Sequence, residues 1–340
     1  MTLSLLLLAL ASATTPAGSA LPEVVTIAAS AAPSNEAPSR RDRSLALLEA
    51  IRGAAGAGVL TRSEQLTQSA SRHAGYLSAH GLRSAPSIHA EAADLAGFTG
   101  ADPFVRMRAA GFRSSYATEV VGAVGQAAAD DDCVDHLMNT VYHAALLLSR
   151  VTQAGVAYGD GPAAGTCVID LATPLEAPGP LVPAPGDIVR YPWPGMSLPT
   201  GTFRPGSENP RPSPALLPGA TAGIPVLVGL RTADALAAAA EPAGIQIQVF
   251  ELRDDRDMAV PSVVLADTAI SGPTIVADKA LHGLFAALVP RQPLPPGRYR
   301  VILHATLGQH VVAPAPWEFS VGRRATPVPG NRDDSAIRER

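Results

Sequence analysis

The chain has 340 residues, which at roughly 100–200 residues per domain predicts two domains. Aromatic residues make up only 4% and charged residues 16%, so the cores must consist mainly of Ala, Val, Leu and Ile. The formal net charge is −4. Nucleic-acid binders usually carry a basic stripe, so no nucleic-acid partner is expected. Lys279 is the only lysine in the sequence, which excludes a Gly-Lys-Ser/Thr phosphate loop.

The N-terminal residues predict a signal peptide. Residues 1–11 form an apolar run that is shorter than the about 20 residues needed to span a bilayer. Small residues follow at the spacing of a cleavage site, at Ala11-Ser12-Ala13 and Gly18-Ser19-Ala20. We therefore expect a signal peptide at 1–20, a flexible leader at 21–40 and a secreted or periplasmic protein. No later stretch of the sequence reaches transmembrane length.

Helical and strand patterns are mixed between residues 41 and 174, without a regular βαβ repeat. Leu45, Leu48 and Ile51 form an apolar stripe that is typical of a helix. Three aspartates at 130–132 favour a helix start, because the helix dipole attracts negative charge there. Helices are expected from 41 to the glycines at 53–58, at 63–80, at 103–110 and at 130–149. Strands are expected at 119–124, 154–158 and 166–171, which predicts an α+β fold class.

The second half of the chain changes character. Residues 175–218 are so rich in proline that a helix is excluded, and we expect a linker at 175–186 and an ordered strap at 187–214. From Ile224 the apolar period drops to two, which predicts an all-β sandwich at 219–322. Strands are expected at 224–230, 245–252, 263–265, 274–276, 284–288, 298–307 and 317–321. Residues 323–340 are expected to be a disordered tail.

Five short motifs follow His89 in order. They are Phe-Thr-Gly at 98–100, Ala-Ala-Gly-Phe at 109–112, Thr-Glu-Val-Val-Gly at 118–122, Leu-Met-Asn-Thr-Val-Tyr-His-Ala-Ala-Leu-Leu at 137–147 and Ala-Gly-Val-Ala-Tyr at 154–158. Over 43–172 this order resembles the CAP superfamily of cysteine-rich secretory, antigen 5 and pathogenesis-related proteins, and most of all its bacterial SCP-like branch. The resemblance implies a CAP-like α-β-α sandwich at 41–174. In the second half, Leu-Pro-Pro-Gly-Arg-Tyr-Arg-Val at 294–301, followed by Trp-Glu-Phe at 317–319, resembles bacterial Ig-like domains.

The CAP resemblance implies a cleft with two histidines and acidic residues. His89 matches the first histidine, His143 the second and Glu119 the glutamate, while Asn139 matches a polar residue four positions before the second histidine. Imidazole and carboxylate groups suit Zn²⁺, so His89 and His143 are candidate ligands for zinc or calcium. The remaining histidines of the helical segments are interpreted as surface or packed side chains: His73, His80 and His136.

Cys133 and Cys167 are the two cysteines of the chain. In an exported protein they are expected to form a disulfide, because extracytoplasmic compartments are oxidising. Two buried free thiols are the alternative.

The CAP resemblance implies non-enzymatic binding of a lipid, of a small apolar ligand or of a partner protein in the cell envelope. One alternative is a metal-dependent hydrolase or peptidase that uses His89, His143 and Glu119. Another is a structural or adhesive envelope protein. Enzymatic activity stays open, with binding as the favoured interpretation.

Overall fold

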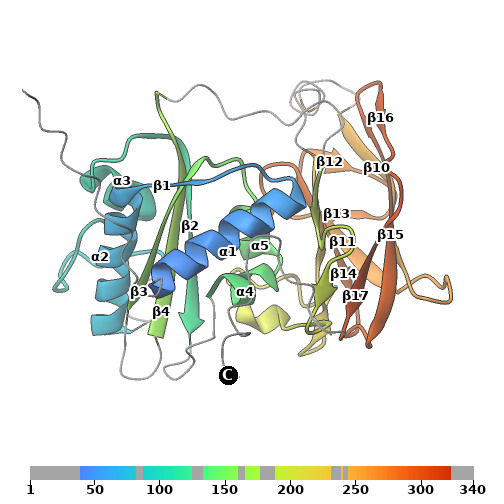
Figure 1. Ribbon diagram of the computed structural model, residues 1–340, viewed down its shortest axis with the longest axis horizontal. Helices are drawn as coiled ribbons and strands as arrows, with labels where there is room; N and C mark the ends of the chain where they lie inside the picture. Colours follow the sequence, from blue (N-terminus) through green and yellow to red (C-terminus); the bar gives the residue numbers. More distant parts are fainter. Residues whose placement is uncertain are drawn as a thin grey trace, which may run out of the picture. The chain divides into compact units, whose positions relative to one another are not determined.

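The computed structural model describes residues 39–81, 87–124, 133–159, 165–176, 188–230, 239 and 244–322 (Figure 1). The predicted signal peptide, the leader up to residue 38 and the predicted tail lie outside these residues. Helices and mixed sheets make the chain α+β, as predicted. None of the described helices is long and apolar enough to cross a membrane. Below, residues 39–176 are called the α/β half and residues 188–322 the β-rich half.

A four-stranded sheet forms the centre of the α/β half, in the order β1-β3-β4-β2. β1 (Thr61–Arg62) is parallel to β3 (Gln153–Gly159), and the other pairs are antiparallel. β4 (Gly165–Pro174) pairs with β2 (Ser114–Val124) along nearly its whole length. The three longer strands contain the predicted strand segments and extend beyond them.

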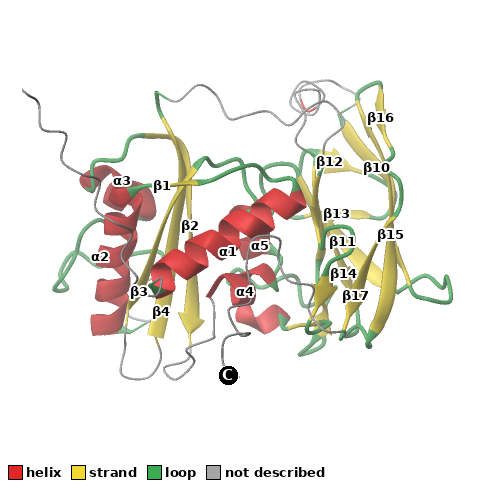
Figure 2. Cartoon of the chain, viewed as in Figure 1, coloured by secondary structure: helices red, strands yellow, loops and turns green. Residues whose placement is uncertain are grey.

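Three helices lie against this sheet, and each agrees with a predicted one. α1 (Arg40–Ala55) and α2 (Glu64–His80) cover opposite faces of the sheet, and α3 (Pro103–Ala109) packs beside α2 (Figures 1 and 2). The first turn of each helix is capped by a side-chain oxygen that accepts a backbone N–H, which satisfies a donor that the helix itself leaves unpaired. The capping residues are Ser39, Ser63 and Asp102.

Two glycines allow α2 to approach β3 closely. A Cβ atom at Gly155 would lie 2.1 Å from Thr67 N, and one at Gly159 would lie 2.3 Å from Ser78 Oγ. Any side chain at Gly155 would therefore collide with the α2 backbone. These glycines set the distance between α2 and the strands that carry the candidate site.

The predicted helix at 130–149 is wrong where the structure describes it, because two short helices form there. α4 (Cys133–Met138) and α5 (Tyr142–Leu147) are separated by a turn. Thr140 Oγ1 donates to Leu137 O at 2.7 Å, and such a side-chain bond competes with the helical backbone bonds. The aspartates at 130–132 lie outside the described residues.

The predicted disulfide between Cys133 and Cys167 is confirmed. It joins α4 to β4 and is fully buried in the apolar core on the α1 side of the sheet. A cross-link over 34 positions restricts the unfolded chain and stabilises the fold by about 4 kcal/mol on loop-closure grounds.

A buried arginine ties α1 to the connection between α5 and β3. The Arg52 guanidinium donates to four carbonyl oxygens at 2.7–3.1 Å, those of Ala57, Leu147, Ser149 and Val151. Burial lowers the pKa of Arg52 to about 10, so the group stays charged at neutral pH. The carbonyl dipoles replace the water that the cation loses.

The β-rich half contains two main sheets with a common apolar core. One sheet has the order β12-β10-β15-β17-β6, with β16 paired to β15, and the other has the order β13-β11-β14-β9-β5; β7 and β8 form a separate pair. The first strands are β5 (Val189–Tyr191), β6 (Ser197–Leu198), β7 (Thr202–Phe203), β8 (Ala222–Gly223), β9 (Val226–Gly229) and β10 (Ile245–Arg253). The remaining strands are β11 (Ser262–Ala266), β12 (Ile270–Ser271), β13 (Ile275–Ala277), β14 (Phe285–Pro290), β15 (Gly297–Leu307), β16 (His310–Val312) and β17 (Trp317–Val321).

The proline-rich strap expected at 187–214 contributes strands to both main sheets. β5 pairs with β9, and β6 pairs with β17. Tyr191 and Phe203 are buried and Trp193 is half-buried, so the strap packs through its aromatic residues as expected. A short 3₁₀ turn at Pro205–Ser207 follows β7. Residues 177–187, which include most of the expected linker, lie outside the described residues.

Candidate functional site

His89 and Glu119, two of the residues that the resemblance assigns to the cleft, form a hydrogen-bonded pair. His89 Nδ1 lies 2.9 Å from Glu119 Oε1. The His89 side chain is 30% exposed, whereas that of Glu119 is 1% exposed. Glu119 projects from β2, and His89 lies in the irregular segment that connects α2 to α3. Since Nδ1 is engaged, Nε2 is the ring nitrogen of His89 that remains for an external group.

A buried arginine from α3 fixes the Glu119 carboxylate. One amino group of Arg106 contacts both carboxylate oxygens, Oε1 at 3.0 Å and Oε2 at 2.7 Å. Its other amino group donates to the backbone oxygens of His89 and Gly100. Arg106 therefore holds both members of the His89–Glu119 pair.

Electrostatics keep Glu119 ionised. Burial alone would raise the pKa of Glu119, but the hydrogen bond from His89 and the charges of His73 and Arg106 lower it below its usual range. A carboxylate in this state is an acceptor for the ring N–H of His89.

A second buried carboxylate closes the segment that carries His89. Glu91 Oε2 accepts the backbone N–H groups of Thr99 and Gly100 at 2.6 and 3.2 Å, and Glu91 Oε1 lies 2.9 Å from His73 Nδ1. The other ring nitrogen of His73 lies 2.9 Å from Ile88 O. Both nitrogens of His73 thus face oxygen atoms, one of Glu91 and one of the backbone. Residues 91–100 form a loop whose two ends are joined by one carboxylate.

A third carboxyl group stands opposite Glu119. Asp170 of β4 is the cross-strand partner of Glu119 and is completely buried. Neither of its oxygens makes a hydrogen bond of good geometry within the described part of the chain, although Ser69 and Glu119 face it closely. Burial raises the pKa of Asp170 well above its usual range, and the nearby charge of Glu119 raises it further. Burial therefore favours the protonated form of Asp170. We call these residues the polar cluster: His73, His89, Glu91, Arg106, Glu119 and Asp170.

The two other residues predicted for the cleft have different partners. His143 Nδ1 lies 3.1 Å from Thr140 Oγ1 and 3.4 Å from Glu208 Oε1. Asn139 lies in the turn between α4 and α5, where its N–H donates to His136 O. The structure thus joins His89 with Glu119 and joins His143 with Glu208 of the strap.

The candidate metal ligands do not fit a metal centre in their present arrangement. Both oxygens of Glu119 are bonded to Arg106, so a cation would have to compete with a guanidinium. Across the described ranges, no group of three His, Cys, Asp or Glu side chains is placed to hold a metal ion.

Three apolar side chains are exposed on α3 and in the segment that precedes it. Phe98 is 39% exposed, Phe104 is 53% exposed and Val105 is 38% exposed. Phe104 and Val105 belong to α3, and Val105 packs against Gly100, two residues after Phe98. Arg106, which follows Val105 on α3, bonds the backbone at His89 and Gly100, so α3 lies next to the segment that carries His89. We call Phe98, Phe104 and Val105 the α3 surface.

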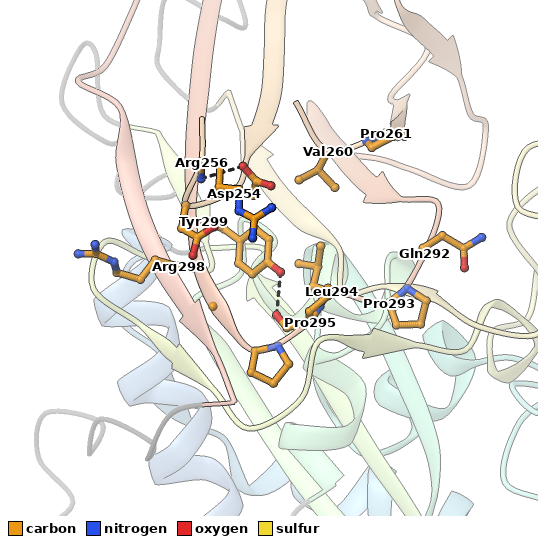
Figure 3. A pocket seen from close by; sticks show the side chains of 13 residues that line it. Asp254, Arg256, Val260, Pro261, Gln292, Pro293, Leu294, Pro295, Arg298 and Tyr299 are labelled. Carbon is orange, nitrogen blue, oxygen red and sulfur yellow. Dashed lines mark hydrogen bonds between the residues drawn. The ribbon is translucent and has the colours of Figure 1, made fainter. Parts of the chain in front are cut away.

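A hollow of about 500 Å³ opens at a different place, at one end of the β-rich half (Figure 3). It lies between the β10–β11 and β14–β15 connections, and Tyr299 OH donates to Pro295 O within it at 2.7 Å. Charged side chains of both signs line it: Asp254, Asp255, Arg256 and Arg298. Its lining includes none of the residues predicted for the cleft.

Sequence reasoning missed most of the polar cluster. His73 shares a helix face with Ala70, Ala74 and Leu77, which favours the packed interpretation given above. Asp170 carried a usable signal, because it interrupts the otherwise apolar run at 167–172. Arg106 and Glu91 carried no such signal, since both types usually lie on the surface.

Comparisons with known proteins identify no relative of this chain. No family model, no curated protein and no solved structure matches the chain. The resemblance to the CAP superfamily and to Ig-like domains therefore stays a prediction from the sequence motifs.

Proposed function

We propose that this chain is an exported protein of the CAP type that binds a lipid or another small apolar ligand without chemical turnover. The α/β half provides the binding surface. The β-rich half is an Ig-like module that acts as a spacer for this surface. The N-terminal apolar run and the buried Cys133–Cys167 disulfide support export, because disulfides persist in oxidising compartments.

One observation carries the proposal: the α3 surface is exposed on and next to the helix whose buried Arg106 holds the segment of the partly exposed His89. Apolar side chains provide the contact area for a ligand tail, and His89 Nε2 provides one polar contact for its head group. Apolar sites with a few fixed polar groups are typical of small-molecule binding. The network beneath the surface limits the entropy lost on binding, since His89 is already oriented by Glu119.

The hydrolase alternative is less well supported. It requires His89, His143 and Glu119 to converge, whereas the polar contacts of His143 in the described residues are with Thr140 and Glu208. The structural alternative differs from our proposal in predicting no saturable ligand binding.

The test is a fluorescence titration of the full chain with cis-parinaric acid, a fatty acid whose emission rises in apolar surroundings. The double variant Phe98→Ser/Phe104→Ser removes the two exposed rings, and we expect it to weaken binding by about tenfold or more. Val311→Ser, at a 73% exposed position on β16, is the matched control and should bind as the unchanged protein does. Absence of saturable binding, or equal affinities for all three proteins, would overturn the proposal.

A further inference from the structure

The first turn of α5 receives its cap from a distant segment. The N-cap position of α5 is Val141, which has no side-chain oxygen to accept the free N–H groups. Glu208 takes this role: its Oε2 accepts Val141 N at 3.0 Å, and its Oε1 accepts Tyr142 N at 2.6 Å and His143 N at 3.4 Å. A carboxylate also complements the positive end of the helix dipole.

Glu208 belongs to the strap and not to the α/β half. Its own N–H bonds Pro205 O at the end of the 3₁₀ turn. On one side of this turn, β7 pairs with β8, and Gly201 O accepts the N–H groups of Ile224 and Leu294. On the other side, Arg291 donates to Leu216 O. The β-rich half therefore fixes the position of the Glu208 carboxylate, whose side chain is fully buried.

A second bond joins α5 to the β-rich half. Tyr142 OH donates to Asp278 Oδ2 at 2.8 Å, and Asp278 lies in the connection between β13 and β14. Burial and this carboxylate both raise the pKa of Tyr142, so the phenol remains a donor throughout the physiological range. We call Glu208, Tyr142 and Asp278 the clasp.

We propose that the clasp is a coupling device through which the β-rich half controls the order of the α4–α5 segment. A six-residue helix is too short to be stable by itself, so α5 depends on its tertiary contacts. The controlled segment includes Asn139 and His143, two of the four residues that sequence motifs assign to the cleft. A change in the strap or in the β13–β14 connection would therefore alter the order of the α4–α5 segment in the α/β half. This inference does not depend on the proposed ligand, because it concerns only the chain's own contacts.

Hydrogen–deuterium exchange of the full chain tests the coupling. In Glu208→Ala, peptides that cover 141–148 should exchange about tenfold faster or more, while those of α2 and β15 keep their rates, since local opening is distinct from global unfolding. Asp278→Ala should produce a smaller increase in the same peptides, because Asp278 makes only one bond to α5 within the described residues. Glu251→Ala, which removes a partly exposed carboxylate from β10, is the matched control and should leave 141–148 unchanged.

Glu208→Gln is the second variant in case the alanine variant does not fold. The amide oxygen still accepts the helix N–H groups but lacks the charge, so we expect exchange at 141–148 between that of the unchanged protein and that of Glu208→Ala. Unchanged exchange at 141–148 in both Glu208 variants would overturn the proposal. An equal acceleration across all peptides would overturn it as well, because it would indicate global destabilisation and not control of one segment.

Discussion

The two faces of the four-stranded sheet differ in the charge that they bury. On the α1 face, Leu48 and Ile51 belong to the same buried apolar cluster as Val156 and Ile169. On the α2 face, the strands bury Glu119 and Asp170 against Arg106 and His73. An apolar face gains free energy simply by leaving water, whereas buried charges cost several kcal/mol each unless they are paired. The apolar burial on the α1 face therefore stabilises the fold. The buried charges on the α2 face cost part of this free energy, and they orient His89.

This difference also explains how the polar cluster can exist in a small fold. Arg106 bonds the carboxylate of Glu119, His73 bonds that of Glu91, and burial favours the protonated, uncharged form of Asp170. Each charge has partners on a different element, so removal of one partner leaves another charge buried and uncompensated.

The largest effect is expected from Arg106→Ala on the α2 face. The substitution leaves Glu119 buried beside Asp170 without its guanidinium, and breaking a buried ion pair in this way costs about 3–5 kcal/mol. Urea denaturation followed by circular dichroism measures the free energy of unfolding. Arg108→Ala, an exposed position on the same helix, is the control and should change stability by less than about 0.5 kcal/mol. A loss below about 1 kcal/mol for Arg106→Ala would contradict the account of this face.

Leu48→Ala tests the α1 face. The side chain is fully buried, and leucine truncation in a core costs about 3 kcal/mol through lost burial and the cavity that remains. Because no charge is involved, the loss should be the same at pH 5 and pH 8. A loss that changed between these pH values by more than about 1 kcal/mol would show that the two faces are not energetically separate.

Near pH 5, Asp170→Asn has the smallest expected effect of the three substitutions, and it changes mainly the pH dependence of stability. The folded-state pKa of Asp170 is raised, so above its unfolded value of 3.8 the folded state holds a proton that the unfolded state has released. Stability from this group is therefore greatest below that value and falls as the pH rises towards the folded pKa, by at most about 1.4 kcal/mol per pH unit. The asparagine variant carries no such proton. Its free energy of unfolding should fall less steeply above pH 4 than that of the unchanged protein, and identical slopes would contradict a protonated Asp170.

The sequence predicted helix ends and strand periodicity, whereas it did not predict contacts between residues that are far apart in the chain. Ser63 and Gly81 mark the ends of α2, and the period of two predicts β15, because both signals come from neighbours in the chain. Motif order assigned His89 and Glu119 to one expected cleft, but it did not predict the hydrogen bond between them.

The features that the sequence did not predict depend on strand register and on partners that are distant in the chain. Asp170 faces Glu119 only because β4 pairs antiparallel to β2 in one particular register, which neither strand specifies alone. The break between α4 and α5 depends in part on Glu208, which caps α5 from the strap. The short strands β5 and β6 were hidden in a proline-rich stretch whose composition indicates a connection.

The most direct test of the central claim is a map of the ligand contact on the full chain. ¹H–¹⁵N correlation spectra recorded during a titration with cis-parinaric acid report which backbone amides change their environment. The account predicts that the largest shifts are confined to residues 87–109, around His89 and the α3 surface. Shifts concentrated in the β-rich half, for example around the hollow between the β10–β11 and β14–β15 connections, or no saturable shifts at all, would contradict it.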